Sequence, residues 1–209
     1  MTTTHPQTFA GSDLAMVYDT RPVFRKQNFA LQQGEMLHVK GANGSGKSSL
    51  LRNLAGLLPL SHGSIALDGQ SVNSNTPEYR QMLSYLGHAN PLDDHISIAR
   101  NLAFFAKIFH QPQALVDQWV SQLGLQHCKD QMPPSCSHGQ KRRSGLIVMF
   151  LKQAPIWILD EPLNGLDDNS LAILTSAFQD HLKKSGMIVM SSHSPIPYAN
   201  HTLVMDKPS

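Results

Sequence analysis

Apolar residues follow two different spacings along this chain of 209 residues. Short apolar runs bounded by glycine, proline or asparagine predict β-strands near its start, at Leu14–Val17, Phe29–Leu31, Met36–Val39, Ser64–Leu67 and Met82–Leu86. Further on, apolar residues recur every three to four positions, which predicts helices at Ile98–Phe109, Leu115–Leu123, Arg142–Gln153 and Ser170–Lys184. Two continuous apolar runs, Ile156–Leu159 and Met187–Ser191, predict buried strands among the later helices.

The order of these elements indicates an α/β fold in a single domain spanning residues 1–209. A helical stretch from Pro91 to about Gln131 interrupts the α/β alternation, so we expect an inserted helical subdomain at approximately 91–145. The chain is long enough for one generous domain with such an insertion.

A phosphate-binding loop is the strongest chemical pattern. The sequence G-x-x-x-x-G-K-[ST] stands between a predicted strand and a predicted helix that runs from Ser48 to Ala55 and stops at Gly56. Glycines allow successive backbone N–H groups to surround phosphate oxygens, and the start of the helix adds its positive end. The nucleotide-binding candidates are Gly41, Ala42, Asn43, Gly44, Ser45, Gly46, Lys47, Ser48 and Ser49.

Two adjacent carboxylates follow the predicted buried strand Ile156–Leu159. Asp160 is positioned to hold Mg²⁺ together with the Ser48 hydroxyl, and Glu161 is a candidate to polarise the water that attacks the γ-phosphate. An Asp-Glu pair alone is as often a solvated strand end. The phosphate loop upstream favours the catalytic interpretation, although a phosphate loop with an acidic strand also fits kinases, GTPases and helicases.

Further elements resemble those of the ATP-binding-cassette (ABC) family. Cys136-Ser137-His138-Gly139-Gln140 resembles the ABC signature, and Leu163–Asp167 resembles the family's D-loop. His193 resembles its switch histidine, and Tyr18 its adenine-stacking aromatic residue. Taken singly, Ser137, Gly139 and Asp167 could be helix caps, and the aromatic and histidine residues ordinary rim or loop residues. Their joint occurrence in the family's order is what identifies the resemblance, which covers essentially the whole chain.

The resemblance implies a P-loop NTPase fold of the ABC cassette type, with a RecA-like core, an N-terminal antiparallel β subdomain and an inserted helical subdomain. It implies ATP hydrolysis with ATP and Mg²⁺ as ligands, and Glu161 and His193 as catalytic residues. It further implies a head-to-tail homodimer in which the signature residues Ser137, His138, Gly139 and Gln140 act on the partner's nucleotide and Asp167 works across the dimer.

The sequence departs from the family pattern at two places. Ala89 stands where the family has a metal-contacting glutamine, which leaves Asn90 as a candidate replacement ligand. Cys136 and His138 replace a leucine and a small residue of the signature. A slow, degenerate ATPase is therefore one expectation.

Composition narrows the partners. Lys+Arg 17 against Asp+Glu 15 gives a formal charge of +2, so no global field favours nucleic acid or anionic lipid. The longest apolar run, Leu146–Leu151, is too short to span a bilayer, and no direct membrane insertion is expected. The polar start of the chain lacks the features of a secretory signal. Cys128 and Cys136 fit no metal or redox motif and are read as reduced thiols.

Among ABC proteins, the chain most resembles the ATP-binding subunits of the haem exporters of cytochrome c maturation. The resemblance lies in Leu86-Gly87-His88, in the run Gly139–Arg143, and in the run Trp157–Pro162. It implies integral membrane subunits of an exporter as partners and a peripheral position on the cytoplasmic face of a bacterial inner membrane. Another small ABC exporter, a soluble ABC ATPase and a small-molecule kinase remain as alternatives.

Overall fold

The computed structural model describes residues 5–207, which divide into two compact units. The first unit comprises the chain up to Tyr85, Ala154–Pro162, and the chain from Phe178 onward. The second comprises Leu86–Gln153 and Leu163–Ala177. The chain therefore passes from the first unit into the second and back again twice. Among the described residues, no helix is both long and apolar enough to cross a membrane.

An antiparallel sheet occupies part of the first unit, in the order β2-β1-β4-β5. Its strands are β1 (Thr8–Tyr18), β2 (Arg21–Gln32), β4 (His62–Leu67) and β5 (Gln70–Val72). Asp68 and Gly69 join β4 to β5 with φ angles of 51° and 73°, the left-handed turn that suits a two-residue hairpin. The strands expected at Leu14–Val17 and Phe29–Leu31 are confirmed as β1 and β2, and each strand is longer than its apolar run.

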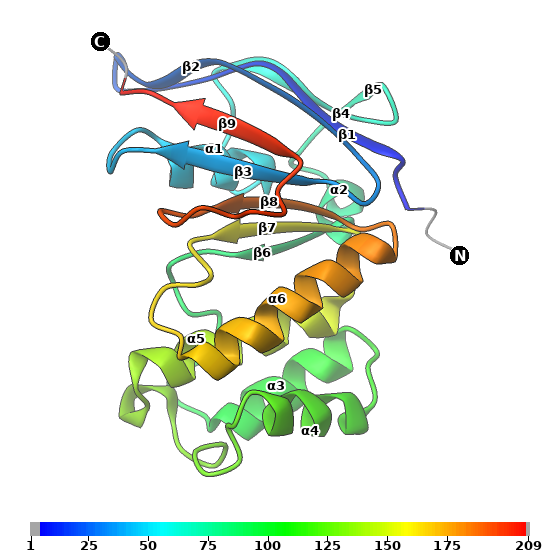
Figure 1. The fold of residues 1–209 in the computed structure, drawn as a ribbon, viewed down its shortest axis with the longest axis vertical. Helices are drawn as coiled ribbons and strands as arrows, with labels where there is room; N and C mark the ends of the chain where they lie inside the picture. The colour runs from blue at the N-terminus through cyan, green and yellow to red at the C-terminus, as the bar shows by residue number, and fades with distance from the viewer. Residues whose placement is uncertain (1–4, 208–209) are drawn as a thin grey trace. The chain divides into compact units, whose positions relative to one another are not determined.

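A second sheet, in the order β6-β7-β8-β3-β9, forms the rest of the framework of this unit (Figure 1). Its strands are β3 (Met36–Gly41), β6 (Leu83–Leu86), β7 (Ile156–Asp160), β8 (Met187–Ser191) and β9 (His201–Met205). β3 pairs in parallel with β8 and β9, and β7 pairs in parallel with β8. The carboxyl ends of β3, β7 and β8 therefore meet at one edge of the sheet.

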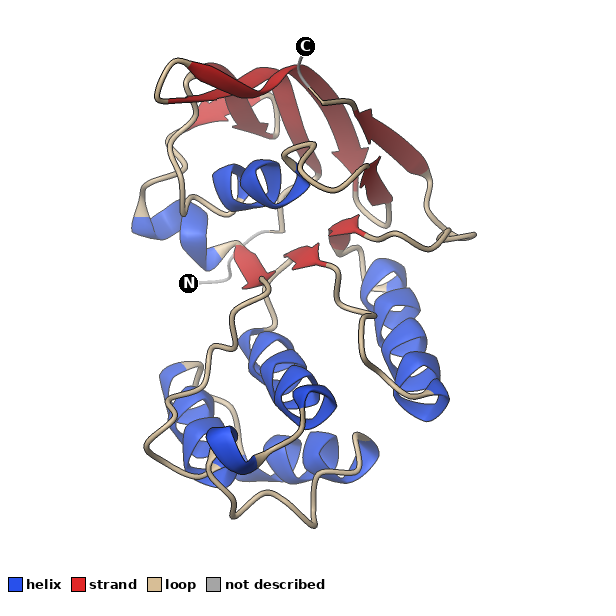
Figure 2. Ribbon diagram, turned by 90° about the vertical axis from the view of Figure 1, so that its left-hand side faces the viewer, coloured by secondary structure: helices blue, strands red, loops and turns tan. Residues whose placement is uncertain are grey.

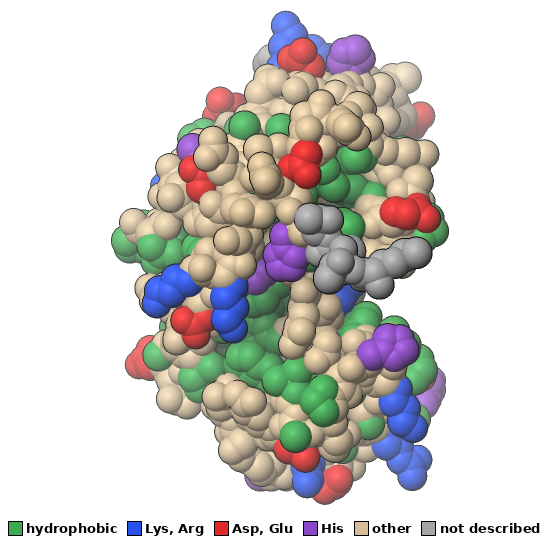
Figure 3. Space-filling view, turned by 90° about the vertical axis from the view of Figure 1, so that its right-hand side faces the viewer, with side chains coloured by type: hydrophobic (Ala, Val, Ile, Leu, Met, Phe, Trp, Pro, Cys, Tyr) green, Lys and Arg blue, Asp and Glu red, His purple; other side chains and the backbone are tan. Residues whose placement is uncertain are grey.

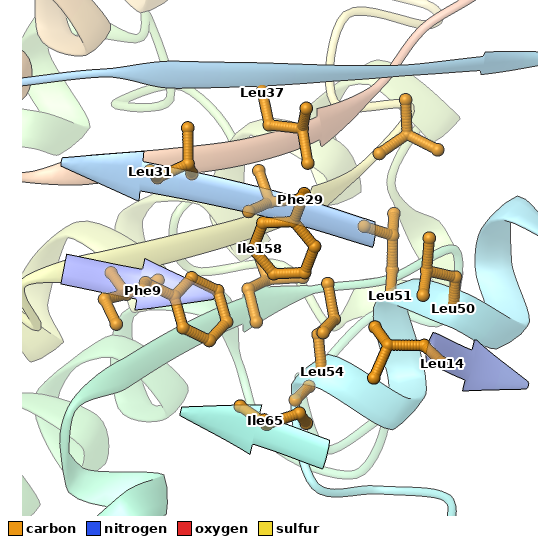
Figure 4. Close-up of a cluster of buried hydrophobic side chains, with 14 of the residues drawn as sticks. Phe9, Leu14, Phe29, Leu31, Leu37, Leu50, Leu51, Leu54, Ile65 and Ile158 are labelled. Atoms are coloured by element: carbon orange, nitrogen blue, oxygen red, sulfur yellow. The ribbon is translucent and has the colours of Figure 1, made fainter. Parts of the chain in front are cut away.

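The core of the first unit lies where helix α1 (Lys47–Leu54) meets side chains of both sheets. Leu50, Leu51 and Leu54 of α1 are fully buried, and Figure 4 shows them among apolar residues of the strands. Those strand residues are Phe9, Phe29, Leu31, Leu37, Ile65 and Ile158. Gly56 takes a left-handed φ of 67° two residues after α1 ends, as expected for a glycine that stops a helix. The short helix α2 (Pro77–Gln81) begins at Thr76, whose side chain accepts the Tyr79 N–H.

The second unit is helical (Figure 2) and contains α3 (Ile98–Ile108), α4 (Gln113–Gln122), the 3₁₀ turn η1 (Pro133–Ser135) and α5 (His138–Lys152). Helix α6 (Asp168–Lys183) begins in this unit and ends in the first. The Trp119 and Phe150 rings pack at a centroid distance of 4.4 Å and join α4 to α5. The expected helices are confirmed, but α5 begins four residues before Arg142. The limits 91–145 for the inserted subdomain stay a prediction.

Candidate functional site

The carboxyl ends of three parallel strands carry most of the residues expected to bind nucleotide in the first unit. The phosphate loop follows β3, Asp160 ends β7 with Glu161 directly after it, and His193 follows β8. The phosphate loop is more than a hundred residues from the other two segments in the sequence, and the parallel pairing of β7 with β8 and of β8 with β3 brings all three to one edge.

The phosphate loop has the backbone that its glycines predict. Gly46 has a φ of 93° and is the N-cap of α1, and a Cβ there would lie 2.9 Å from the Val23 carbonyl oxygen. A Cβ at Gly41 would collide with the Met205 carbonyl oxygen and the Ser45 hydroxyl. Glycine is thus required at both positions for close backbone approach as well as for the turn.

Lys47 folds back over the loop. Its ammonium group donates to the carbonyl oxygens of Gly41 at 2.8 Å and Ala42 at 3.2 Å, and the side chain is buried. The Ser45 hydroxyl is buried as well and has no hydrogen-bond partner among residues 5–207. A buried polar group without a partner is costly, so this hydroxyl suits a ligand or water oxygen. Ala42, Asn43 and Gly44 are exposed, while Ser48 and Ser49 are half-buried.

Ser191 bonds both to Asp160, the last residue of β7, and to Glu161, which follows it. Its hydroxyl donates to Asp160 Oδ1 at 2.7 Å and accepts the Glu161 backbone N–H at 3.0 Å. Asp160 is fully buried, and Glu161 has a φ of 49°, which is unusual for a residue with a side chain. The separate roles expected for these two carboxylates stay predictions. The sequence did not predict that Ser191 bonds to Asp160 and Glu161, because it does not show that β7 and β8 are neighbours.

Glu161 and His193 form a direct pair. The distance from His193 Nε2 to Glu161 Oε1 is 2.9 Å, and the Glu161 side chain is only 12% exposed. Two residues that the sequence singled out as catalytic candidates are therefore in contact within one chain.

The donors present fit a magnesium ion. Ser48 offers a hydroxyl and Asp160 a buried carboxylate, both of them oxygen ligands. Among residues 5–207 no group of three or more His, Cys, Asp or Glu side chains is placed to hold a metal. Mg²⁺ bound with a nucleotide needs no such group, because water and phosphate oxygens complete its shell.

The signature lies at the start of α5 in the second unit. The Ser137 hydroxyl accepts the Gln140 N–H at 3.2 Å, and Gln140 Oε1 accepts the Ser137 N–H at 2.7 Å, which forms a capping box. Gln140 Nε2 lies 3.0 Å from His127 Nε2. The helix thus begins inside the signature. The apolar pattern did not predict this start, because the residues after Gln140 are basic.

The D-loop packs on the signature helix of the same chain. Asp167 Oδ1 accepts the Ser170 N–H at 2.8 Å, and Arg143 Nη1 lies 2.7 Å from Asp167 Oδ2. Hydrogen bonds from Ser170 and the nearby Arg143 charge lower the pKa of Asp167. A Cβ on Gly139 would lie 2.9 Å from the Gly165 carbonyl oxygen. Asp167 is therefore a helix-capping residue here, and its action across a dimer stays a prediction.

Tyr18 and Asn90, the residues expected to stack on adenine and to contact the metal, have the following surroundings. Tyr18, at the end of β1, is 72% exposed and opposes Arg21 across the hairpin. Asn90 belongs to the second unit, where its amide oxygen accepts the Leu92 N–H at 3.3 Å. Adenine stacking and metal contact stay predictions for these two.

Comparison with known proteins agrees with this geometry. The family model described as "ABC transporter" matches residues 24–164. A cytochrome c biogenesis ATP-binding export protein, CcmA, of Paramagnetospirillum magneticum is 38% identical over 194 residues, covering 90% of this chain and 89% of that protein. The CcmA of Idiomarina loihiensis is 37% identical, covering 90% and 87%.

Solved structures show the same fold. An ATP-binding subunit of an ABC transporter aligns with a TM-score of 0.83 at 23% identity, covering 94% of this chain and 85% of that one. The cbiO1 protein of Clostridium perfringens, part of the ABC transporter complex cbiONQ, aligns with a TM-score of 0.75 at 25% identity, covering 96% and 85%.

A phosphate loop, an Asp-Glu pair at the end of a buried strand and a capped signature helix together define an ATPase cassette. The fold that carries them has an antiparallel sheet, a sheet with parallel strand pairs, and a helical unit. The chain belongs to the ABC transporter family and, within it, to the family of cytochrome c biogenesis ATP-binding export proteins. It is an ATP-binding and ATP-hydrolysing subunit.

Proposed function

We propose that this chain is the ATPase subunit of a haem exporter of cytochrome c biogenesis, bound peripherally to the cytoplasmic face of a bacterial inner membrane. The printed names of its relatives support the exporter assignment. On the face that Figure 3 shows, acidic and basic side chains are interspersed, which favours recruitment through protein contacts over a charged lipid or nucleic-acid surface.

The pair formed by Glu161 and His193 is the observation that carries the hydrolytic mechanism. The carboxylate accepts a hydrogen bond from the water that attacks the γ-phosphate, and His193 contacts that water or the phosphate. Ser191 holds the Asp160 carboxylate and the Glu161 backbone N–H, so the Asp160 side chain and the Glu161 backbone are fixed before substrate arrives. The products are ADP and phosphate.

Other residues of the first unit bind and orient the nucleotide. The loop N–H groups and the start of α1 hold the phosphates, Lys47 exchanges its carbonyl contacts for phosphate oxygens, and Tyr18 stacks on the adenine. Ser48 and Asp160 hold Mg²⁺, with Asn90 as a further candidate ligand. The ion neutralises charge that develops on the phosphoryl oxygens.

The active enzyme is a head-to-tail dimer in which the signature acts on the partner's ATP. The capping box starts α5 at the signature, so Ser137, His138 and Gly139 lie at the N-terminus of this helix. The positive end of the helix dipole there favours binding of an anionic phosphate. Asp167 contributes from the D-loop. ATP with Mg²⁺ should convert the hydrolysis-deficient Glu161→Gln protein to dimers in sedimentation. Monomer alone at saturating ATP would contradict the composite site.

The segment Pro91–Arg100 is the candidate docking surface for the membrane subunits. Asp93, Asp94 and His95 are exposed, while buried Asn101 donates to the Asp93, Ile96 and Ser97 carbonyl oxygens. The buried amide therefore holds an exposed acidic loop in one shape. Charge reversal at Asp93 and Asp94 should weaken membrane association and leave nucleotide affinity unchanged.

Glu161→Gln tests the hydrolytic role. The variant should bind ATP with normal affinity and release phosphate at least about 100-fold more slowly, because the amide cannot accept the proton of the attacking water. Glu35→Gln is the matched control, since Glu35 forms a similar pair with His201 at 3.0 Å but precedes β3, at the end opposite the phosphate loop. Unchanged phosphate release by Glu161→Gln would remove this residue from the mechanism.

The exporter assignment is tested in cells. Replacing Lys47 by alanine should deplete covalently haemylated c-type cytochromes while b-type cytochromes persist, because haem synthesis is untouched. Haem-stained gels of membrane fractions measure both. Normal c-type cytochromes would refute the exporter assignment and leave the ATPase activity standing.

A further inference from the structure

A buried histidine that has no role in the proposed hydrolytic mechanism lies beside the residue that precedes His193. His38 is in the middle of β3 and is only 1% exposed. Its neighbours Leu37 and Val39 belong to the apolar cluster against α1, so His38 faces the other side of the sheet. Imidazole is rarely placed at such a position without a polar partner.

The partner of His38 is the carbonyl group that precedes the switch histidine. His38 Nε2 lies 3.1 Å from the Ser192 carbonyl oxygen. A carbonyl can only accept, so Nε2 carries the proton and donates. Burial lowers the pKa of His38, which keeps the ring neutral with a single N–H.

The peptide group that His38 holds is the one that leads into His193. Ser191 is fixed by its hydroxyl to Asp160, and the Ser192 side chain accepts the Ser194 N–H at 3.1 Å. Without His38, the Ser192 carbonyl would be free to rotate and would turn the following residue with it. The backbone that leads into His193 is therefore held by a residue of another strand.

We propose that His38 is a positioning residue for hydrolysis: its Nε2–H holds the Ser192 carbonyl and thereby aims His193 at Glu161 and the attacking water. This role rests on the proposed function of Glu161 and His193. His38 does not touch substrate in this scheme and acts only through the backbone of the switch segment.

His38→Leu tests the proposal because it keeps an apolar volume and removes the donor. The kcat for ATP should fall about tenfold or more, since small misplacements of a catalytic group are costly, while KM for ATP stays within about twofold. His38→Gln, which returns an N–H donor, should recover most of the loss. A His38→Leu enzyme with wild-type kcat, or a His38→Gln enzyme as slow as His38→Leu, would overturn the proposal.

His181→Leu is the matched control for packing. His181 is also largely buried with Nε2 near a backbone carbonyl, that of Pro155 at 3.2 Å, but this carbonyl precedes β7 at the end remote from Glu161. Its substitution should lower stability and leave kcat unchanged. An equal loss of kcat in both leucine variants would mean that His38 acts only through packing.

Coupling to His193 separates this inference from the proposed function. In a His193→Ala background, His38→Leu should change kcat by less than about twofold, because the group that it positions is gone. If Glu161→Gln retains wild-type hydrolysis, the proposed function fails. If Glu161→Gln is inactive and the effects of His38→Leu and His193→Ala multiply independently, only the positioning role fails. Histidine ¹⁵N NMR of the unaltered protein gives a direct check, since an Nδ1–H tautomer for His38 would also overturn it.

Discussion

His181 should make the stability of this protein fall as the pH falls below about 6.5. The ring stacks on Trp157 at a centroid distance of 3.8 Å with planes 11° apart, and Nε2 lies 3.2 Å from the Pro155 carbonyl oxygen. Burial lowers the pKa of His181 from 6.5 to about 4. The unfolded chain therefore takes up a proton between these values that the folded chain does not.

The sign and size follow from that difference. Above pH 6.5 His181 is neutral in both the folded and the unfolded state, and the protein keeps its full stability. As the pH falls toward 4, only the unfolded state gains the proton, so the free energy of unfolding decreases. At pH 5 the cost to folding is about 2 kcal/mol, because one unit of pKa difference corresponds to about 1.4 kcal/mol.

Urea unfolding followed by circular dichroism measures this effect. Between pH 7.5 and pH 5 the wild-type midpoint should fall by roughly 1 M more than that of His181→Leu, for an m-value of about 2 kcal/mol/M. His62→Leu, at an exposed histidine of β4, should follow the wild type. If wild type and His181→Leu lose the same stability over this interval, the histidine is not held neutral by burial.

Three further substitutions have defined outcomes. Ser191→Ala removes a buried hydrogen bond to the Asp160 carboxylate and should destabilise the fold by about 1.5–3 kcal/mol in urea unfolding and slow hydrolysis; an unchanged midpoint and turnover would contradict the bridging role. Gly139→Ala places a Cβ 2.9 Å from the Gly165 carbonyl oxygen, so steady-state ATPase should fall while nucleotide affinity, measured by fluorescent-ATP titration, persists. Asn90→Ala should slow hydrolysis with ATP affinity near normal, and wild-type turnover would show that this loop does not contact the metal.

Local chemistry made much of the site predictable. The pattern G-x-x-x-x-G-K-[ST] between a strand and a helix predicts a phosphate loop, and Gly46 takes the left-handed backbone that such a loop needs before α1. Apolar runs likewise predict buried strands, and the run that ends at Asp160 became β7 with every residue buried. Both features depend on neighbouring residues alone.

The remaining elements are short or polar, and hydrogen bonds that the apolar pattern does not show hold them in place. β9 (His201–Met205) has only a three-residue apolar run, Leu203–Met205, after two exposed residues, and it is held by its pairing with β3. The start of α5 is polar and depends on the reciprocal cap between Ser137 and Gln140. Periodicity cannot detect an element whose stability comes from hydrogen bonds to another segment or to its own cap.

The sequence by itself determined the family, the phosphate loop and the identity of the acidic residues, because these depend on residue types at fixed local spacing. Only the tertiary structure decided that Ser191 bridges Asp160 and Glu161, that His193 reaches Glu161, and that His38 holds the peptide before it. Each of these contacts joins strands far apart in the chain, and strand order follows from packing of the whole sheet, which no local pattern encodes.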